Sequence, residues 1–295
     1  MCFPRVKKVS IMQIKVSVYI TTYNRLELLK RAVASVKNQS YQTIEIIVAD
    51  DGSTDGTKEY LKEMQEQGLL LSTINETGKS KGACYGRNKA LSLATGDFIT
   101  GLDDDDYFEN WRIDSFVQYW FKLEQEKTKD IAGLFDGVLE VRENGNFAHN
   151  NSEYVDYNML KSLNYIGNQV FTKTEYLLKI GGFDEKMPAL QDWDTWIRLA
   201  KEYGTFENIK KNSYIIVQNH GMARISEKKA NSIRVAFKRL NMKHKPNSLK
   251  EKASRIEAMC NYSQVKINKN ELVILLMASK FKVIFRLFKS GLKRV

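Results

Sequence analysis

The stretch FITGLDDDD, residues 98–106, places four aspartates directly after a short apolar run. The stretch IEIIVADDGSTD, residues 44–55, repeats this design. Apolar runs of this length, bounded by turn residues, are typical of buried parallel strands. In open α/β sheets, ligands bind beyond the carboxyl ends of the strands. Because adjacent carboxylates repel one another unless a cation lies among them, the two stretches predict a metal-dependent nucleotide site in an α/β fold.

The first hundred residues alternate between strand and helix patterns. β-branched and aromatic residues indicate the first strand, and apolar residues then recur at helical spacing. Asp55 is placed to cap the second helix. The predicted strands are 16–20, 44–49, 69–74 and 98–102, with helices 26–36, 57–67 and 83–94 between them. This order predicts a mainly parallel sheet with helices on both faces.

The patterns after residue 110 are more mixed. Helices are indicated at 111–125, 173–180 and 192–202, strand pairs within 131–141, and single strands at 165–172 and 214–217. After residue 225 the chain becomes helical, basic and different in composition. We therefore predict an N-terminal extension (1–13), one α/β domain (14–225) and a helical tail (226–295).

Charge is distributed unevenly along the chain. The sequence carries 46 Lys and Arg against 35 Asp and Glu, a net charge of +11. Residues 226–295 hold 18 Lys and Arg and 4 Asp and Glu, so the remainder is net negative by 3. A basic tail on a weakly acidic body indicates an anionic partner, either a membrane or a nucleic acid.

Cysteine usage and hydropathy bear on location. The 3 cysteines are scattered, with no C-x-x-C pair, which argues against a disulfide framework or a zinc site and fits a reducing compartment. No apolar stretch has the length of a transmembrane helix, and residues 1–15 lack the pattern of a secretory signal. We expect a cytoplasmic protein whose translation starts at Met1 or Met12.

Four motifs together resemble those of a known enzyme family. They are Val16 to Asn24, Asp50 to Asp55, Gly86-Arg87-Asn88, and Gly96-Asp97-Phe98 running into Leu102 to Asp106. In this order and spacing they resemble the inverting family 2 glycosyltransferases, such as those of bacterial O-antigen and capsule synthesis. The resemblance covers about residues 14–225. It implies a GT-A fold in which residues 14–110 bind the nucleotide sugar and residues 111–225 bind the acceptor.

The resemblance implies a divalent-metal site at the four aspartates. The family's D-x-D motif matches Asp103 to Asp105, so Asp105 is the expected ligand of Mn²⁺ or Mg²⁺, with Asp103 beside it. Asp103 or Asp104 then faces the ribose, and Asp106 leaves the register open by one position. Such hard ions prefer oxygen ligands, and Mg²⁺ typically takes one or two carboxylates plus substrate phosphates. The alternative is a solvated acidic turn.

The resemblance places four further residues at the nucleotide. Asp51 would accept a hydrogen bond from the uracil N3–H, and Thr21 and Tyr23 would line the base pocket. Arg87 would meet the base or the phosphates. Considered alone, Tyr23 is equally explained by packing over the sheet edge, Arg87 by a position on the surface, and Asp-Asp-Gly-Ser by a simple turn.

Leu190 to Trp193 stands where the family has its acidic "ED" motif, with Gln191 in place of Glu. Asp192 then matches the general base, which takes the proton of the attacking acceptor hydroxyl. At a helix start the macrodipole favours the ionised carboxylate. The alternative is that Asp192 only caps the helix. Trp193 and Trp196 either stack on acceptor sugar or belong to the core, and we expect core for one of them.

His220 follows the last predicted strand, where family members often have a histidine at the metal or the pyrophosphate. We therefore include His220 among the expected metal-site residues. The alternative is a purely structural histidine, and no sequence context supports a role for His149 or His244.

The tail from Glu271 to Arg294 is amphipathic. One helical face carries the basic residues Lys282, Arg286, Lys289 and Lys293. A second face carries the apolar residues Met277, Phe281, Ile284, Phe285, Phe288 and Leu292. A basic face beside large apolar residues suits an interfacial membrane helix. The alternative is a helix that docks on the body of the protein or on a partner.

These features predict a metal-dependent inverting glycosyltransferase at the inner face of the plasma membrane. It would transfer a hexose (glucose, galactose or N-acetylhexosamine) from a UDP-sugar to a polyprenyl-diphosphate-linked saccharide, forming a β-linkage. A nucleotidyltransferase acting on sugar phosphates is a second hypothesis, but the sequence lacks a P-loop-like or Gly-rich activating motif. The third is nucleic-acid binding through the tail. The net negative body disfavours it, so we expect no nucleic-acid partner.

Overall fold

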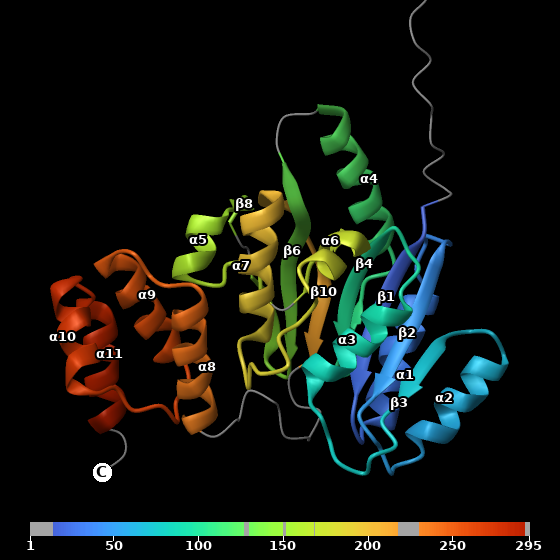
Figure 1. The fold of residues 1–295 in the computed structure, drawn as a ribbon, viewed down its shortest axis with the longest axis horizontal. Helices are drawn as coiled ribbons and strands as arrows, with labels where there is room; N and C mark the ends of the chain where they lie inside the picture. Colours follow the sequence, from blue (N-terminus) through green and yellow to red (C-terminus); the bar gives the residue numbers. More distant parts are fainter. Residues whose placement is uncertain (1–13, 127–129, 150–151, 168, 218–229, 293–295) are drawn as a thin grey trace, which may run out of the picture.

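The computed structural model describes residues 14–126, 130–149, 152–167, 169–217 and 230–292. Their centre is a 10-stranded sheet whose main path runs β3-β2-β1-β4-β9-β6-β10-β5, with β7 paired to β6 and β8 paired to β10. Helices flank the sheet, and the helices after residue 230 lie together at one end of the molecule (Figure 1). The predicted α/β fold with a helical C-terminal region is confirmed. The predicted N-terminal extension lies outside the described residues.

The N-terminal half is built as the sequence alternation predicts. Its four strands pair in parallel and are connected by three helices. The elements are β1 (Val16–Thr22), α1 (Leu26–Lys37), β2 (Ile44–Asp50), α2 (Thr57–Glu66), β3 (Leu71–Ile74), α3 (Ala83–Leu93) and β4 (Phe98–Asp103). Because parallel strands end at the same edge, the aspartates after β2 and β4 come to one side of the sheet.

The second half differs from the sequence prediction in its strands. Its elements are β5 (Asp106–Phe108), α4 (Arg112–Glu126), β6 (Ile131–Arg142), β7 (Gly145–His149), β8 (Tyr154–Val155), α5 (Tyr157–Ser162), β9 (Phe171–Lys173), α6 (Thr174–Lys179), α7 (Gln191–Tyr203) and β10 (Thr205–Val217). β6 is one long strand, and the strand expected at 165–172 shortens to β9. β10 starts well before Tyr214, because pairing with β6 holds its polar first half in the sheet.

Alternate residues of the central strands enter two separate cores. Val18 and Ile20 of β1 pack with α1 and α4, whereas Tyr19 packs with α3 and α7. Gly101 in β4 keeps room for this second core. A Cβ atom at Gly101 would lie 2.0 Å from Gln169 Oε1 and 2.4 Å from Tyr19 Cζ. The glycine in FITGLDDDD is therefore a position of close approach at the end of the strand.

Within the described residues 230–292, four helices follow the sheet: α8 (Ala230–Lys243), α9 (Leu249–Met259), α10 (Lys269–Met277) and α11 (Phe281–Leu292). α8 and α9 contribute to the same hydrophobic core as α7. His244, after α8, lies with Nε2 2.8 Å from the buried Asp194 of α7, and Arg255 of α9 donates to the Lys161 carbonyl at 2.7 Å. These contacts join the tail to the body. The predicted boundary at residue 225 lies outside the described residues.

The amphipathic tail is two helices rather than one. Ser279 has φ 56° between α10 and α11, and α11 folds back beside α10 (Figure 1). Ile284 is buried at 8% exposure among residues of α9 and α10, so the prediction that it belongs to a membrane-facing stripe is wrong. Lys293 and the side chain of Leu292 lie outside the described residues. Within the described chain, no helix is both long and apolar enough to span a bilayer.

Candidate active site

The ends of β1, β2 and β4 form the edge at which the predicted nucleotide residues gather. Thr21 of β1 is in register with Ala49 of β2 and with Asp103 of β4. Asp51 follows β2 directly, and Tyr23 follows β1. The Tyr23 side chain is 48% exposed, so its ring is open to a ligand.

Both carboxylate oxygens of Asp51 bind the loop before α3. Oδ1 accepts from Asn75 Nδ2 at 3.0 Å and from the Lys81 amide at 2.8 Å. Oδ2 accepts from the Ser80 hydroxyl at 2.5 Å and from the Gly82 amide at 2.8 Å. Burial acts to raise the pKa of Asp51, but these hydrogen bonds outweigh burial and lower it. A ligand N–H would reach this carboxylate by replacing one of the four donors.

Arg87 joins the two halves of the site. Its Nη1 donates to Asp192 Oδ1 at 2.6 Å, and its Nη2 donates to Asp103 Oδ1 at 3.2 Å. Burial acts to lower the pKa of Arg87, but the carboxylates of Asp192 and Asp103 outweigh it and raise that pKa. Arg87 is 4% exposed, so the alternative of a surface arginine is wrong. The expected base and the end of β4 are therefore linked by one guanidinium.

Three residues of this network were missed by sequence reasoning. Gln169 Nε2 donates to Asp103 Oδ1 at 3.3 Å, and its Oε1 accepts from the Tyr19 hydroxyl at 3.0 Å. The ring of Phe183 lies 5.3 Å from Arg87 Cζ. The available signals were indirect: Gly101 marks the close approach of Tyr19 and Gln169, and Phe183 follows the Gly181-Gly182 turn.

The four aspartates after Leu102 have different surroundings. Asp104 is buried and accepts from the Thr22 hydroxyl at 2.8 Å and from Arg25 Nη1 at 3.1 Å. Burial raises the pKa of Asp104 to about 6, against the opposing effect of Arg25. Asp105 also accepts from Arg25, at 3.1 Å. Asp104 and Asp106 are 5% and 4% exposed, so the alternative of a solvated acidic turn is wrong.

Asp103 and Asp105 are the expected ligands of a divalent metal. Both offer hard oxygen donors at the end of β4, and their side chains are 28% and 17% exposed. The described residues contain no cluster of three His, Cys, Asp or Glu suited to a metal. A Mg²⁺-type site nevertheless needs only one or two carboxylates when substrate phosphates complete the coordination shell. The carboxylates of Asp103 and Asp105 therefore fit a divalent cation. The third expected ligand, His220, lies outside the described residues.

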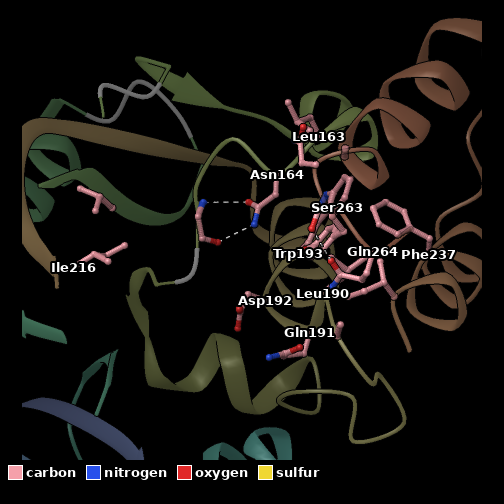
Figure 2. A pocket seen from close by; sticks show the side chains of 17 residues that line it. Leu163, Asn164, Leu190, Gln191, Asp192, Trp193, Ile216, Phe237, Ser263 and Gln264 are labelled. Carbon is pink, nitrogen blue, oxygen red and sulfur yellow. Dashed lines mark hydrogen bonds between the residues drawn. The ribbon is translucent and has the colours of Figure 1, made fainter. Parts of the chain in front are cut away.

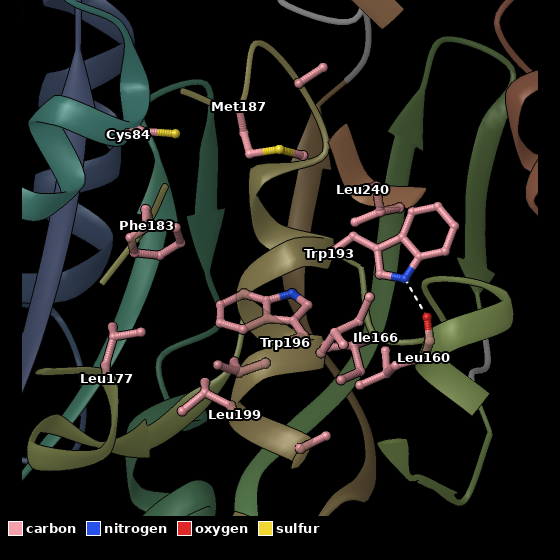
Figure 3. Close-up of a cluster of buried hydrophobic side chains, with 14 of the residues drawn as sticks. Cys84, Leu160, Ile166, Leu177, Phe183, Met187, Trp193, Trp196, Leu199 and Leu240 are labelled. Carbon is pink, nitrogen blue, oxygen red and sulfur yellow. Dashed lines mark hydrogen bonds between the residues drawn. The ribbon is translucent and has the colours of Figure 1, made fainter. Parts of the chain in front are cut away.

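The two tryptophans of α7 belong to the core. Trp193 is 3% exposed and donates through Nε1 to the Leu160 carbonyl at 2.6 Å. Trp196 is 1% exposed and donates to the Gly167 carbonyl at 3.1 Å. Figure 3 shows both indoles among aliphatic side chains of the core. The core explanation therefore applies to both rings, but Trp193 also contributes to the lining of the cavity beside Asp192, whereas Trp196 does not.

A cavity of about 1000 Å³ opens beside Asp192. Asp192 lies in the first turn of α7, whose N-cap residue is Leu190, and its carboxylate accepts from Arg87. In Figure 2, Ile216 and the C-terminal side chains lie on opposite sides of Asp192. The C-terminal region lines one wall with Ile233, Phe237, Ala258, Asn261, Tyr262, Ser263 and Gln264. The acceptor-binding region predicted from the sequence, residues 111–225, does not include these C-terminal residues.

Comparison with known proteins identifies the relatives of this chain. The sequence model of the family described as Glycosyl transferase family 2 matches residues 17–166. The chain is 32% identical over 217 residues to the putative colanic acid biosynthesis glycosyl transferase WcaA of Escherichia coli (strain K12), covering 72% of this chain and 75% of WcaA. It is 35% identical over 138 residues to the UDP-Glc:alpha-D-GlcNAc-diphosphoundecaprenol beta-1,3-glucosyltransferase WfaP of Escherichia coli, covering 43% of this chain and 53% of WfaP.

The solved structures that share the fold include the following two. S. aureus TarS 1-349 in complex with UDP-GlcNAc has a TM-score of 0.63 at 19% identity, covering 90% of this chain and 79% of that chain. The mannosyltransferase PcManGT from Pyrobaculum calidifontis, in complex with GDP-Man and Mn²⁺, has a TM-score of 0.56 at 19% identity, covering 94% of this chain and 79% of that chain.

The architecture is that of the GT-A glycosyltransferases. The chain is a glycosyltransferase. It belongs to glycosyltransferase family 2, as the order of its four motifs predicts.

Proposed function

We propose that this chain is an inverting, metal-dependent glycosyltransferase of surface-polysaccharide synthesis. It transfers a hexose from a UDP-sugar to a saccharide linked to polyprenyl diphosphate. The observation that carries the proposal is the Asp103–Arg87–Asp192 network. It joins the edge formed by the ends of β1, β2 and β4 to the cavity beside Asp192. The likeness to WcaA, a putative glycosyl transferase of colanic acid biosynthesis, supports the pathway, and the likeness to WfaP, which acts on a diphosphoundecaprenol-linked sugar, supports the lipid-linked acceptor.

The proposed reaction is a single displacement at the anomeric carbon of the donor. The acceptor oxygen forms a bond to that carbon while the bond from the carbon to the UDP oxygen breaks. Asp192 takes the proton of the acceptor hydroxyl, and UDP leaves with the electrons of the broken bond. Attack from the opposite face converts an α-linked donor into a β-linkage. Arg87 orients the Asp192 carboxylate through the contact between its Nη1 and Asp192 Oδ1.

The nucleotide is assigned to the edge formed by β1, β2 and β4. Thr21 and Tyr23 line the base, and Asp51 accepts from the uracil N3–H in exchange for a donor of its loop. Of the two carboxylates considered for the ribose, we assign Asp103, because Asp104 is buried against Thr22 and Arg25.

The metal is assigned to Asp105 together with Asp103, as Mn²⁺ or Mg²⁺. When bound, the cation offsets charge that develops on the departing diphosphate, acting as a Lewis acid. The complex of PcManGT with GDP-Man and Mn²⁺ supports this assignment by fold alone. His220 remains a proposed third ligand.

A donor screen tests the proposed reaction. The full-length protein is incubated with Mn²⁺, a synthetic saccharide on a polyprenyl diphosphate, and each of the common UDP- and GDP-sugars in turn. We expect UDP release above the no-acceptor background with at least one UDP-hexose, and a β-linked product by NMR. Absence of UDP release with every donor, together with release of inorganic pyrophosphate from UTP and a hexose 1-phosphate in a parallel incubation, would contradict the proposal and favour a nucleotidyltransferase.

The proposed location is the inner face of the plasma membrane. Six apolar side chains of α10 and α11 are 46–70% exposed and form what we call the apolar patch: Val273, Leu276, Met277, Phe281, Phe285 and Phe288. Lys282, Arg286 and Lys289 lie exposed on α11 among them. Glu271, the single acidic residue in 269–292, is paired with Arg234 at 2.9 Å. This combination is complementary to an anionic bilayer surface.

Phe281→Ser/Phe285→Ser is expected to release the protein from liposomes that contain anionic lipid. Burying a Phe side chain contributes about 1.5–3 kcal/mol, so losing two should abolish most pelleting in a co-sedimentation assay. Lys282→Gln/Lys289→Gln should give a partial, salt-sensitive release, since each cation contributes on the order of 1 kcal/mol. The control is Phe147→Ser/Leu178→Ser, at exposed apolar positions of β7 and α6. Equal pelleting of all variants would reject the apolar patch as the anchor.

A further inference from the structure

A second cavity lies behind the C-terminal wall of the cavity beside Asp192, which we call the acceptor cavity. Its volume is about 750 Å³, within the usual range for sites of drug-sized ligands. Asn261, Tyr262 and Ser263 line both cavities. We call this second cavity the tail groove. The loop after α9 therefore separates it from the cavity that contains Asp192.

The lining of the tail groove is apolar with a cationic rim. The apolar lining consists of Val265, Ile267, Leu272, Ile284, Leu287 and Phe288. Three exposed cationic residues form the rim of the tail groove: Lys266, Lys269 and Arg286. None of its lining residues is acidic. Within the described chain, the ammonium groups of Lys266 and Lys269 form no salt bridge, so their charge is available to an anion.

Two contacts connect the groove to the catalytic side. Arg286 Nη2 donates to Asn261 Oδ1 at 3.2 Å, which places a groove cation on the shared wall. The Tyr262 ring packs edge to face on Phe237, which lines the acceptor cavity, at 6.4 Å. Burial first, and then the charge of Asp192, raise the pKa of Tyr262. At its other end the groove includes Phe288, which belongs to the apolar patch.

We propose that the tail groove binds the polyprenyl diphosphate of the lipid-linked acceptor, while the saccharide crosses the Asn261–Ser263 wall toward Asp192. The inference rests on the proposed function and adds a site to it. An isoprenoid diphosphate combines a flexible apolar chain with a dianionic or trianionic head, and the groove offers the complement of both. Its volume holds only the head-proximal part of a long polyprenyl chain, so the remainder would stay in the bilayer next to the apolar patch.

The test is direct binding of farnesyl diphosphate to the full-length protein, by titration calorimetry at concentrations at which the lipid does not form micelles. Farnesol and inorganic pyrophosphate are titrated separately, because each carries one half of the recognised chemistry. We expect saturable binding of farnesyl diphosphate, with both partial probes at least tenfold weaker. Pyrophosphate binding as tight as farnesyl diphosphate would overturn the proposal, since it would indicate a simple anion site.

Two variants locate the binding. Lys266→Glu/Lys269→Glu reverses the rim charge and should weaken farnesyl diphosphate binding at least tenfold. Lys245→Glu/Lys250→Glu makes the same change of charge at exposed lysines outside the groove and should leave binding unchanged. Leu272→Trp, which fills the groove with a ring, should also weaken binding without changing the net charge. Equal losses in the two lysine pairs, or unaltered binding in Leu272→Trp, would overturn the site.

This experiment contains neither donor nor turnover, so its outcome is independent of the donor screen. If no UDP is released but farnesyl diphosphate binds and the groove variants weaken that binding, the proposed reaction is contradicted and the lipid site is supported. If UDP is released but the groove variants leave farnesyl diphosphate binding unchanged, the proposed reaction is supported and the lipid site is contradicted.

Discussion

Asp192→Asn is expected to lower the turnover number by about a hundred- to ten-thousandfold, the usual contribution of a general base. The amide has nearly the shape of the carboxylate but cannot accept the proton of the acceptor hydroxyl. Arg87 keeps its contact with Asp103, so the strand-end edge should stay assembled. Binding of the UDP-sugar, measured by calorimetry, should therefore survive the substitution. The rate is measured as UDP release at saturating donor and acceptor.

The control for this prediction is Asp130→Asn, the same chemical change at an exposed position before β6. It should leave both donor affinity and turnover as in the unmodified protein. Thermal melting of both variants checks that the loss of the Asp192–Arg87 pair has not unfolded the site. If Asp192→Asn binds the UDP-sugar much more weakly but has a normal turnover number at saturating donor, Asp192 is not the base.

Asp105→Asn is expected to lower transfer by about a hundred- to a thousandfold. Metal-ion stabilisation of the leaving charge is worth several kcal/mol, and each 1.36 kcal/mol is about tenfold in rate. EDTA should abolish activity of the unmodified protein, and added Mn²⁺ should restore it. In Asp105→Asn the Mn²⁺ concentration for half-maximal activity should rise strongly. Full activity in EDTA, with an unimpaired Asp105→Asn variant, would reject the metal at this residue.

The neighbouring carboxylate supplies the matched control. Asp104 is buried against Thr22 and Arg25, so Asp104→Asn should lower the melting temperature without changing the Mn²⁺ concentration for half-maximal activity. If Asp104→Asn instead raised the Mn²⁺ concentration for half-maximal activity and Asp105→Asn did not, the metal ligand would be Asp104 rather than Asp105. The pair of variants thus resolves the ambiguity that four consecutive aspartates leave.

The sequence by itself determined the parallel strands and the acidic edge of this protein. Strand 44–50 and strand 98–103 are specified by short apolar runs and by the turn residues that follow them. Such signals are local, since the conformation of each segment depends mainly on residues within a few positions along the chain. Four local motifs in order were then sufficient to indicate the family, which the match over residues 17–166 confirmed.

Only the tertiary structure decided how the chemical groups meet. Arg87 and Asp192 are 105 residues apart in the chain, and Tyr19 and Gln169 are 150 apart. No local pattern encodes such pairs, because they depend on how strands and helices pack. The same holds for the tail: its periodicity indicated an amphipathic helix, but the turn at Ser279 buried Ile284 and left Phe285 exposed. Packing of α8 and α9 on α7 then made the basic tail one wall of the cavity beside Asp192.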